Sequence, residues 1–381
     1  MIKSIFFVIN TFSGLGGHYY SLVTTATALS RKYNVHIVNL GERVSPVIEK
    51  SGLPYTHVFS NFRNQLSVTR NLIQIISGIR PDVIHAFDQT SYMLSFHAAW
   101  IKKIPLVVTK CGGPTNPKYP YSNNLIVYTK EDLTFFNSRY TSDQNQVVLI
   151  PNRVIPFGQD TERISSLQNK LHLEQKRVVL RIGRIDPFYY ETSKQCINLI
   201  KELHNLDDSF VLLFVGNIVD RQTMQNMLQD AQGCDFIHFV TDRDYTLNAK
   251  ELIDIAEIVV GTGRGFMEAC SRGKKMMAPN VGQAFPILVD QENFDKVFYY
   301  NFSERYHEDK ETKIDDILVK LNTVTPDSSI WFERYFSYKK IEPLYTAFYT
   351  SLKPTRYLKI FTSINKGLFL LFIHGFINKK R

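Results

Sequence analysis

Two sets of short apolar runs, each run followed by a stretch of helical periodicity, constrain how this chain can fold. In the first half, the runs are SIFFVIN (4–10), VHIVNL (35–40), PDVIHAF (81–87) and PLVVTK (105–110). Continuous apolar runs between helices are typical of strands that are buried on both faces of a parallel sheet. We therefore predict an N-terminal α/β domain over residues 1–155, built around a doubly wound sheet.

The same alternation restarts after a polar stretch of alternating charge, Arg153–Lys176. The new apolar runs, again separated by helical patterns, are RVVLRIG (177–183), FVLLFVG (210–216) and EIVVG (257–261). We predict a second α/β domain over residues 175–345. The expected fold class is therefore α/β, with two Rossmann-like domains that face each other across a cleft.

Composition limits the class of protein further. Of the 381 residues, 44% are apolar and 21% are charged, so each domain can bury a core of its own. The four cysteines form no C-x-x-C pair and have no histidine cluster beside them, which argues against a zinc site and fits a reducing cytosol. No apolar run is long enough for a membrane-spanning helix, and the N-terminus lacks the features of a secretory signal. We expect a cytoplasmic protein without a bound metal.

The net charge of +9 is concentrated near the C-terminus. No Asp or Glu occurs between Pro343 and Arg381, and seven of the nine net charges fall in that stretch. A nucleic-acid-binding face would need its charge spread over a fold, so we expect no nucleic-acid partner. Residues 353–381 are predicted to form a basic amphipathic tail. Two alternatives stay open for it: a final helix packed on the first domain, or, over residues 357–381, an in-plane anchor on anionic lipid.

A glycine-rich loop follows the first predicted strand, in TFSGLGGHYYSL (11–22). A dinucleotide fingerprint would require a third glycine at position 19, which is Tyr19, so the spacing argues against NAD. Gly16 and Gly17 precede a helical pattern and would let a ligand approach the helix N-terminus, where free N–H groups attract anions. The alternative is a flexible turn.

Several motifs, taken in order, resemble those of the family 4 glycosyltransferases of the GT-B architecture. Besides the glycine loop and PDVIHAF, they are VVLIPNRV (147–154), RIGRID (181–186), LLFVGN (212–217) and LIDIAEIVVGTGRGFMEACSRGKKMMAPN (252–280). The resemblance implies a hexosyltransferase of the bacterial surface-polysaccharide type, which moves a sugar from a nucleotide-sugar donor to a polysaccharide or a lipid-linked acceptor. It also implies retention of anomeric configuration, no metal and no cofactor. The second domain would hold most of the donor, and the first would face the acceptor.

Catalysis of this kind must stabilise the charge that develops on a diphosphate leaving group. We expect Arg184 to bind the diphosphate, because the arginine fork suits phosphate, with Lys194 as a second cation. The alternatives are a surface salt bridge and a solvated lysine. Glu268 is expected to accept hydrogen bonds from the donor's ribose, or only to stabilise a helix N-terminus. The expected donor-binding residues are Gly16, Gly17, Gly216, Asn217, Gly263, Arg264 and Gly265.

Three positions depart from the family pattern, one of which is Tyr190, where the family has a lysine, with Lys194 a turn later. The first of two donor-site acids would fall at Val260 and is missing. Arg264, in the loop GTGRG, stands nearby, and we predict that it pairs with donor phosphate or a sugar carboxylate. The backbone N–H groups of this loop would form an anion nest, unless the loop is a plain turn. Cys111 stands near the position of a family histidine, and no base beside it would make it a nucleophile.

The predicted acceptor side consists of His85, Asp88 and Cys111, although a lone histidine after a buried strand is more often structural. We expect a peripheral protein on the inner face of the cell membrane. Two rival functions stay open. The missing acid and Cys111 would suit a GT-B-like nucleotide-binding protein without turnover. A Rossmann-type oxidoreductase or an epimerase is disfavoured by Tyr19.

Overall fold

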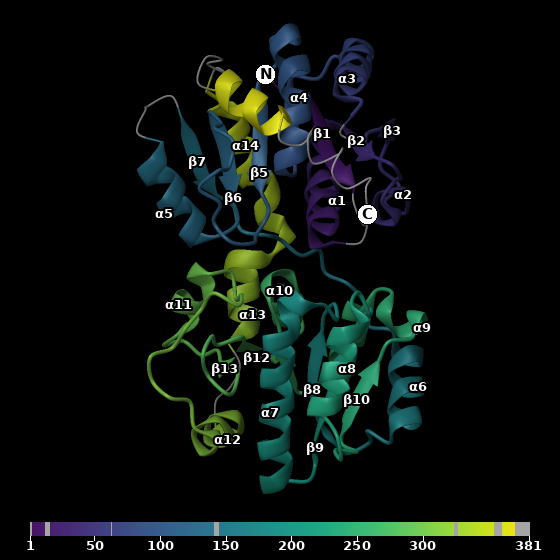
Figure 1. Cartoon of the computed structure of the whole chain (residues 1–381), viewed down its shortest axis with the longest axis vertical. Coiled ribbons are helices and arrows are strands. Elements are labelled where there is room, and N and C mark those ends of the chain that lie inside the picture. The colour runs from purple at the N-terminus through teal and green to yellow at the C-terminus, as the bar shows by residue number, and fades with distance from the viewer. Residues whose placement is uncertain are drawn as a thin grey trace. The chain divides into compact units, whose positions relative to one another are not determined.

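A computed structural model of the chain describes residues 2–11, 16–61, 63–140, 145–323, 327–353 and 360–369. The chain divides into two compact units (Figure 1). The first consists of Met1–Arg153 together with Tyr338–Arg381, and the second of Val154–Ser337. Each unit has its own sheet flanked by helices. The predicted α/β class with two Rossmann-like domains is therefore confirmed.

The first unit is built on a seven-stranded sheet in the order β3-β2-β1-β4-β5-β6-β7. Neighbouring strands pair in parallel throughout. The strands are β1 (Ser4–Thr11), β2 (Asn34–Gly41), β3 (Tyr55–Phe59), β4 (Val83–Ala86), β5 (Leu106–Lys110), β6 (Asn124–Val127) and β7 (Gln146–Leu149). Strand order reverses between β1 and β4, which is the point where doubly wound sheets bind ligands beyond their carboxyl ends.

Side-chain alternation along β1 separates two cores, one on each face of this sheet. Phe6 and Val8 point into a core shared with α3 (Gln65–Ile79), α4 (Gln89–Lys102) and α5 (Lys130–Arg139). Ile5, Phe7 and Ile9 point into the other core. The helices on that second face are α1 (Gly17–Leu29), α2 (Pro46–Glu49) and α14 (Ile341–Thr350). Both faces of the sheet are therefore covered, as continuous apolar runs require.

The second unit has a six-stranded sheet in the order β10-β9-β8-β11-β12-β13, in which only β13 runs antiparallel. Its strands are β8 (Arg177–Ile182), β9 (Phe210–Val215), β10 (Ile237–Val240), β11 (Ile258–Val260), β12 (Lys275–Ala278) and β13 (Ile287–Leu288). Its helices are α6 (Thr161–Leu171), η1 (Pro187–Tyr189), α7 (Tyr190–Leu206), α8 (Arg221–Asp230), α9 (Arg243–Thr246), η2 (Ala249–Ile255), α10 (Gly263–Cys270), α11 (Phe294–Tyr299), α12 (Ile314–Thr323), α13 (Ser328–Trp331) and η3 (Phe332–Phe336).

The unit boundaries differ from those expected from the sequence at both ends of the second unit. Residues 154–174 include α6, whose Ile164 and Leu167 pack into the core of the second unit. The short helix η4 (Tyr338–Lys340) and α14 belong instead to the first unit, because Tyr345 and Tyr349 are buried against its sheet. The second unit is therefore an insertion within the first.

The predicted tail contains a helix at residues 360–369, which packs on the first unit. Ile360 and Ile364 are buried in the core that also holds α3 and α4, and the backbone carbonyl of Leu368 accepts a hydrogen bond from Gln65. Of the two alternatives for the tail, residues 360–369 adopt the packed one. The rest of the predicted anchor, 357–359 and 370–381, lies outside the described residues.

Candidate functional site

The loops that follow β8 and β9 lie against each other at the carboxyl edge of the second sheet. The amide of Ile185 donates to the carbonyl of Asn217, and the amide of Val219 donates to the carbonyl of Ile185, both at 2.9 Å. A Cβ atom on Gly216 would collide with the carbonyl oxygen of Gly183. Gly216 is therefore required for the close packing of two backbones, while the side chain of Asn217 is exposed.

Arg184 lies in the first of these two loops, with 52% of its side chain exposed. Its Nε is 3.4 Å from Oδ2 of Asp186, and its guanidinium carbon is 5.3 Å from the centre of the Tyr189 ring. Asp186 is itself fixed, because it accepts from the amide of Phe188 at the start of η1. One edge of the Arg184 guanidinium group is thus held by Asp186 and Tyr189, while half of the side chain is exposed to solvent. Lys194, in the second turn of α7, is exposed.

Arg264 and Glu268, which the sequence suggested would contact different parts of a donor, pair with each other. Both lie in α10, one turn apart, and Nε of Arg264 donates to Oε1 of Glu268 at 2.7 Å. Their side chains are only 11% and 13% exposed. Lys250 of η2 interacts electrostatically with both, and burial lowers the pKa of its ammonium group. This arrangement forms a half-buried cluster of two cations and one anion.

The amides of the glycine loop GTGRG are largely used within the protein. Gly261 donates to the carbonyl of Met277 at 2.9 Å, and Gly263 donates to the carbonyl of Asn301 at 3.1 Å. The amide of Gly265 donates to Thr262 at 3.0 Å. Gly263 also has φ +48°, a backbone conformation that favours glycine. These three N–H groups do not form the predicted anion nest, because each already has an acceptor.

In the first unit, Gly16 is the residue at the N-terminal cap of α1, and its carbonyl accepts from the amide of Tyr19 at 3.0 Å. A Cβ atom on Gly16 would lie 2.8 Å from the ring of His18, whereas one on Gly17 would meet nothing within 4 Å. Access of a ligand to this helix N-terminus stays a prediction. The rest of the loop, residues 12–15, lies outside the described part of the chain.

His85 is a core residue, and its predicted contact with an acceptor is wrong for this conformation. Its side chain is fully buried in β4, with Nδ1 2.7 Å from the hydroxyl of Tyr349 and Nε2 2.7 Å from the hydroxyl of Thr109. Burial lowers its pKa to about 3, so the ring is neutral. Both ring nitrogens are occupied, which agrees with the structural alternative for this histidine.

Asp88 and Cys111 lie at the carboxyl ends of β4 and β5. The carboxylate of Asp88 caps α4 by accepting from the amide of Ser91 at 2.7 Å, and it accepts from the amide of Asn10 at 2.8 Å. Burial raises the pKa of Asp88. The Cys111 thiol donates to the carbonyl of Phe87, and burial raises its pKa to about 12. Because the nucleophile is the thiolate, the expectation that Cys111 is no nucleophile stands.

Three charged residues that we did not single out from the sequence have strong structural roles. Lys110 and Asp132 form a buried ion pair at 2.9 Å, and Lys110 also donates to the carbonyls of Gly112 and Gly113. Arg181 of β8 is 2% exposed and donates to the carbonyl of Val260 at 3.2 Å. The ion pair was not detectable from the local sequence, because Asp132 lies in another element than Lys110. The burial of Arg181 was not detectable because an arginine in a strand is usually exposed.

A surface hollow of about 630 Å³ lies beside the loop that follows β10, still in the second unit. Charged residues of both signs dominate its lining: Asp160, Arg163, Arg243, Asp244, Tyr245, Leu247, Asn248 and Glu251. Arg163 is held by the carbonyls of Tyr245 and Leu247. The hollow lies beyond the carboxyl end of β10, the edge strand of the sheet, and not at the point between β8 and β11 where strand order reverses and α/β sheets bind ligands.

Comparison with known proteins agrees with this geometry. Residues 15–163 match the model of Glycosyltransferase Family 4, and no curated protein matches the chain in sequence. Anabaena HepE in complex with UDP and glucose superimposes with a TM-score of 0.65 and 16% identity, covering 92% of this chain and 100% of its own. A glycosyltransferase from Rickettsia africae gives 0.68 and 14%, covering 93% and 100%. The chain is therefore similar to Glycosyltransferase Family 4 over residues 15–163, and it has the two-domain GT-B fold of these structures.

The same fold also serves other chemistry on nucleotide sugars. A putative UDP-N-acetylglucosamine 2-epimerase from Listeria monocytogenes superimposes on this chain with a TM-score of 0.60 and 12% identity, covering 93% of this chain and 98% of its own. At such identities, similarity establishes the fold alone. The donor, the acceptor and the reaction's stereochemistry must therefore be argued from the residues of this chain.

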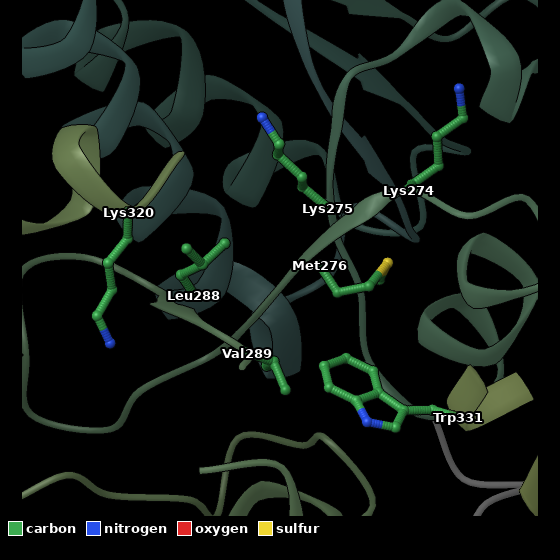
Figure 2. Close-up of a pocket in the computed structure, with 7 residues that line it drawn as sticks. All are labelled: Lys274, Lys275, Met276, Leu288, Val289, Lys320 and Trp331. Carbon is green, nitrogen blue, oxygen red and sulfur yellow. The ribbon is translucent and has the colours of Figure 1, made fainter. Parts of the chain in front are cut away.

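A second, small hollow of about 10 Å³ in the second unit has seven lining residues: Lys274, Lys275, Met276, Leu288, Val289, Lys320 and Trp331 (Figure 2). The ammonium groups do not converge in this view, and each has a carboxylate partner: Asp254 for Lys274, Glu257 for Lys275 and Asp290 for Lys320. This hollow is therefore not an anion site. Within the described ranges there is no group of three His, Cys, Asp or Glu side chains able to hold a metal.

Proposed function

We propose that this chain is a glycosyltransferase that moves a sugar from a nucleoside diphosphate donor, with UDP as the first nucleotide to test, to a polysaccharide or a lipid-linked acceptor. The family match and the similarity to the UDP complex of HepE over most of the chain support this donor class. The observation that carries the proposal is Arg184, a half-exposed arginine fixed at the carboxyl edge of the second sheet.

In the proposed reaction, the bond between the anomeric carbon and the diphosphate oxygen breaks. A bond from an acceptor hydroxyl to the same carbon forms, and the hydroxyl proton is released. Negative charge grows on the departing diphosphate, and Arg184 would bind it most strongly at that stage. Asp186 and Tyr189 hold the base of Arg184 so that its fork is pre-organised for two phosphate oxygens. Lys194 would supply a second, more mobile cation.

Glu268 would contact the donor's ribose through Oε2, since its Oε1 accepts from Nε of Arg264. Arg264 then acts as a positioning residue, since its Nε holds Oε1 of Glu268. This assignment replaces the idea that Arg264 itself binds phosphate as its main role. We further propose that transfer retains anomeric configuration and needs no metal. Both follow from the resemblance to the family and from the use of basic side chains at the leaving group.

The proposed function is tested by incubating the full chain with UDP-, GDP-, dTDP- and CMP-sugars. Thermal shift identifies the nucleotide that binds, because a ligand specific for the folded state raises the unfolding temperature. Hydrolysis or transfer is then followed by release of the nucleoside diphosphate, with and without EDTA. Conversion of the sugar to its epimer without nucleotide release would identify an epimerase instead. Binding without either reaction would identify a nucleotide-binding protein.

A further inference from the structure

The outer surface of the first unit carries a layer of three helices, α3, α4 and the helix at residues 360–369. They cover the same face of the seven-stranded sheet, and the last of them lies beside α4 (Figure 1). Its position is fixed by polar contacts: Nε2 of His97 lies 3.2 Å from Oδ1 of Asn365, and the amide of Tyr121 donates to the hydroxyl of Ser363. The inward side chains of this layer pack into the core of the first unit.

The outward side of the layer exposes large apolar side chains at two places. At one end, Trp100 is 43% exposed, Ile101 56% and Phe361 39%, and the rings of Trp100 and Phe361 lie 5.9 Å apart. At the other end, Leu66 and Phe369 are still more exposed. Single exposed apolar residues are ordinary, but aromatic side chains gathered on one face usually mark an interaction surface.

The charge on these three helices has one sign. There is no Asp or Glu in residues 65–81, in residues 89–130 or in residues 343–381. The exposed charged side chains on the layer are instead basic: Arg70, Arg80, Lys102, Lys103 and Lys366. Lys102 and Lys103 directly follow Trp100 and Ile101, so cations flank the apolar end of the layer. A helical layer that faces only water normally mixes charges of both signs.

We propose that this face, defined by Trp100, Ile101, Lys102, Lys103 and Phe361, binds the surface of an anionic lipid membrane. Tryptophan is stable in the headgroup region because its ring is amphipathic, phenylalanine adds apolar contact, and lysines meet lipid phosphates. A second copy of the chain fits less well, because a two-fold interface would place these basic residues opposite one another. Among the described helices, none has the length and apolar character of a membrane span.

This surface differs from the anchor expected from the sequence. The apolar side of the tail helix, with Ile360 and Ile364, faces the protein core, and the membrane contact comes from its other side together with the end of α4. The inference rests on the proposed function only for its purpose, which is to bring the enzyme to a lipid-linked acceptor. Lipid binding itself requires neither donor nor turnover and is measured without them.

The distribution of tryptophans allows a direct test. The chain has two tryptophans, of which Trp100 lies in the proposed face and Trp331 is buried in the second unit. Vesicles of phosphatidylcholine with phosphatidylglycerol should co-sediment with the full chain and shift the Trp100 emission to the blue, whereas pure phosphatidylcholine should do neither. Brominated lipid should quench wild type and the Trp331→Phe variant, but not the Trp100→Phe variant.

Charge reversal provides the matched comparison. Lys102→Glu with Lys103→Glu should weaken binding to anionic vesicles by at least about tenfold. Lys339→Glu with Lys340→Glu makes the same change in net charge at exposed lysines beside α14, on the opposite side of the sheet, and should weaken binding much less. Equal loss in both double variants, or binding without quenching of Trp100, would overturn the proposal. So would a dimer that buries Trp100 in the absence of lipid.

The outcomes also separate this inference from the proposed function. If the chain binds vesicles but turns over no nucleotide sugar, the lipid-binding face is supported and the proposed enzymatic function is rejected. If the chain hydrolyses the donor but does not bind anionic vesicles, the enzymatic function is supported and the lipid-binding face is rejected. The Lys102→Glu, Lys103→Glu variant should keep wild-type hydrolysis of the donor in solution, because these lysines lie in the first unit, at the end of α4.

Discussion

The Nδ1 atom of His85 lies 2.7 Å from the hydroxyl oxygen of Tyr349, which joins β4 to α14 across 264 positions of sequence. Both side chains are fully buried, and the ring of His85 packs among Phe7, Phe87 and Tyr345. The late helix is thereby fixed on the early sheet by a specific polar contact as well as by apolar packing. This contact makes the stability of the first unit depend on pH.

We expect the free energy of unfolding of the first unit to fall below about pH 6.5. Burial lowers the pKa of His85 to about 3, whereas a histidine in an unfolded chain titrates near 6.5. Between these values the unfolded chain binds a proton that the folded chain does not, which removes up to about 1.4 kcal/mol for each pH unit. Urea unfolding of the Trp331→Phe variant, followed by Trp100 fluorescence, measures this unit alone.

The control for that measurement is a second histidine. His85→Gln should make the pH dependence clearly shallower, while His57→Gln, at an exposed position of β3, should leave it unchanged. Other half-buried histidines, such as His36 and His97, contribute to the total slope in every variant, because burial lowers the pKa of each. Identical slopes with and without His85 would show that its protonation is not linked to unfolding.

Arg184→Ala should reduce turnover of the donor by roughly two orders of magnitude or more, because it removes charge stabilisation at the leaving group. The fold should be intact, since half of this side chain is exposed. Arg184→Lys should recover only part of the rate, because a lysine lacks the bidentate fork. The matched control is Arg221→Ala, an exposed arginine at the start of α8. Steady-state kinetics with turnover within about threefold of wild type would reject the assignment.

Arg264 and Glu268 should behave as one unit in a double-mutant cycle. Either single change, Arg264→Ala or Glu268→Ala, leaves a half-buried charge without its partner and should destabilise the second unit by roughly 1–3 kcal/mol. The double variant should lose less than the sum of the two, with a coupling of about 1 kcal/mol or more. Unfolding is followed by Trp331 fluorescence in a Trp100→Phe background. Additive losses would mean that the contact is not energetically significant.

The four cysteines should differ in their reaction with iodoacetamide near pH 8. Cys196 and Cys270 are buried, and the pKa of the Cys111 thiol is raised by burial to about 12, so none of the three holds appreciable thiolate there. Cys111 and Cys234 are both partly exposed, and the raised pKa of Cys111 leaves Cys234 to be alkylated first. Peptide mapping by mass spectrometry measures the order. Rapid modification of Cys111 in the folded chain would contradict the raised pKa that excludes it as a nucleophile.

Local sequence predicted the strands that form the centre of each sheet, because those strands are continuous apolar runs. It missed β3, in which Tyr55, His57 and Phe59 are exposed, since an edge strand carries no such run. It also left α6 inside a linker, because only Ile164 and Leu167 of that polar helix are buried. Both errors have the same origin: elements at the margin of a sheet bury few residues.

The candidate site was predictable in its elements but not in its pairings. The motif RIGRID placed Arg184 at a strand end, where the structure has it, because the apolar run before it ends at the same position. The pairing of Arg264 with Glu268 follows from helical spacing of four. The resemblance to the family predicted instead that each of the two residues contacts the donor. The partners of His85 lie on distant segments, which no local pattern encodes. Contacts of this kind depend on tertiary structure alone.

The insertion of the second unit between Arg153 and Tyr338 has a consequence for synthesis on the ribosome. Every residue of the second unit, Val154–Ser337, is made before α14 exists. The inserted unit can therefore reach its native state while the earlier sheet still has an unfilled site for Tyr345 and Tyr349 on one face. Domains fold as units while the chain emerges, so the segment translated first should be the last to complete its core. A chain released early, before α14, would expose that apolar face and become a substrate for chaperones or proteases.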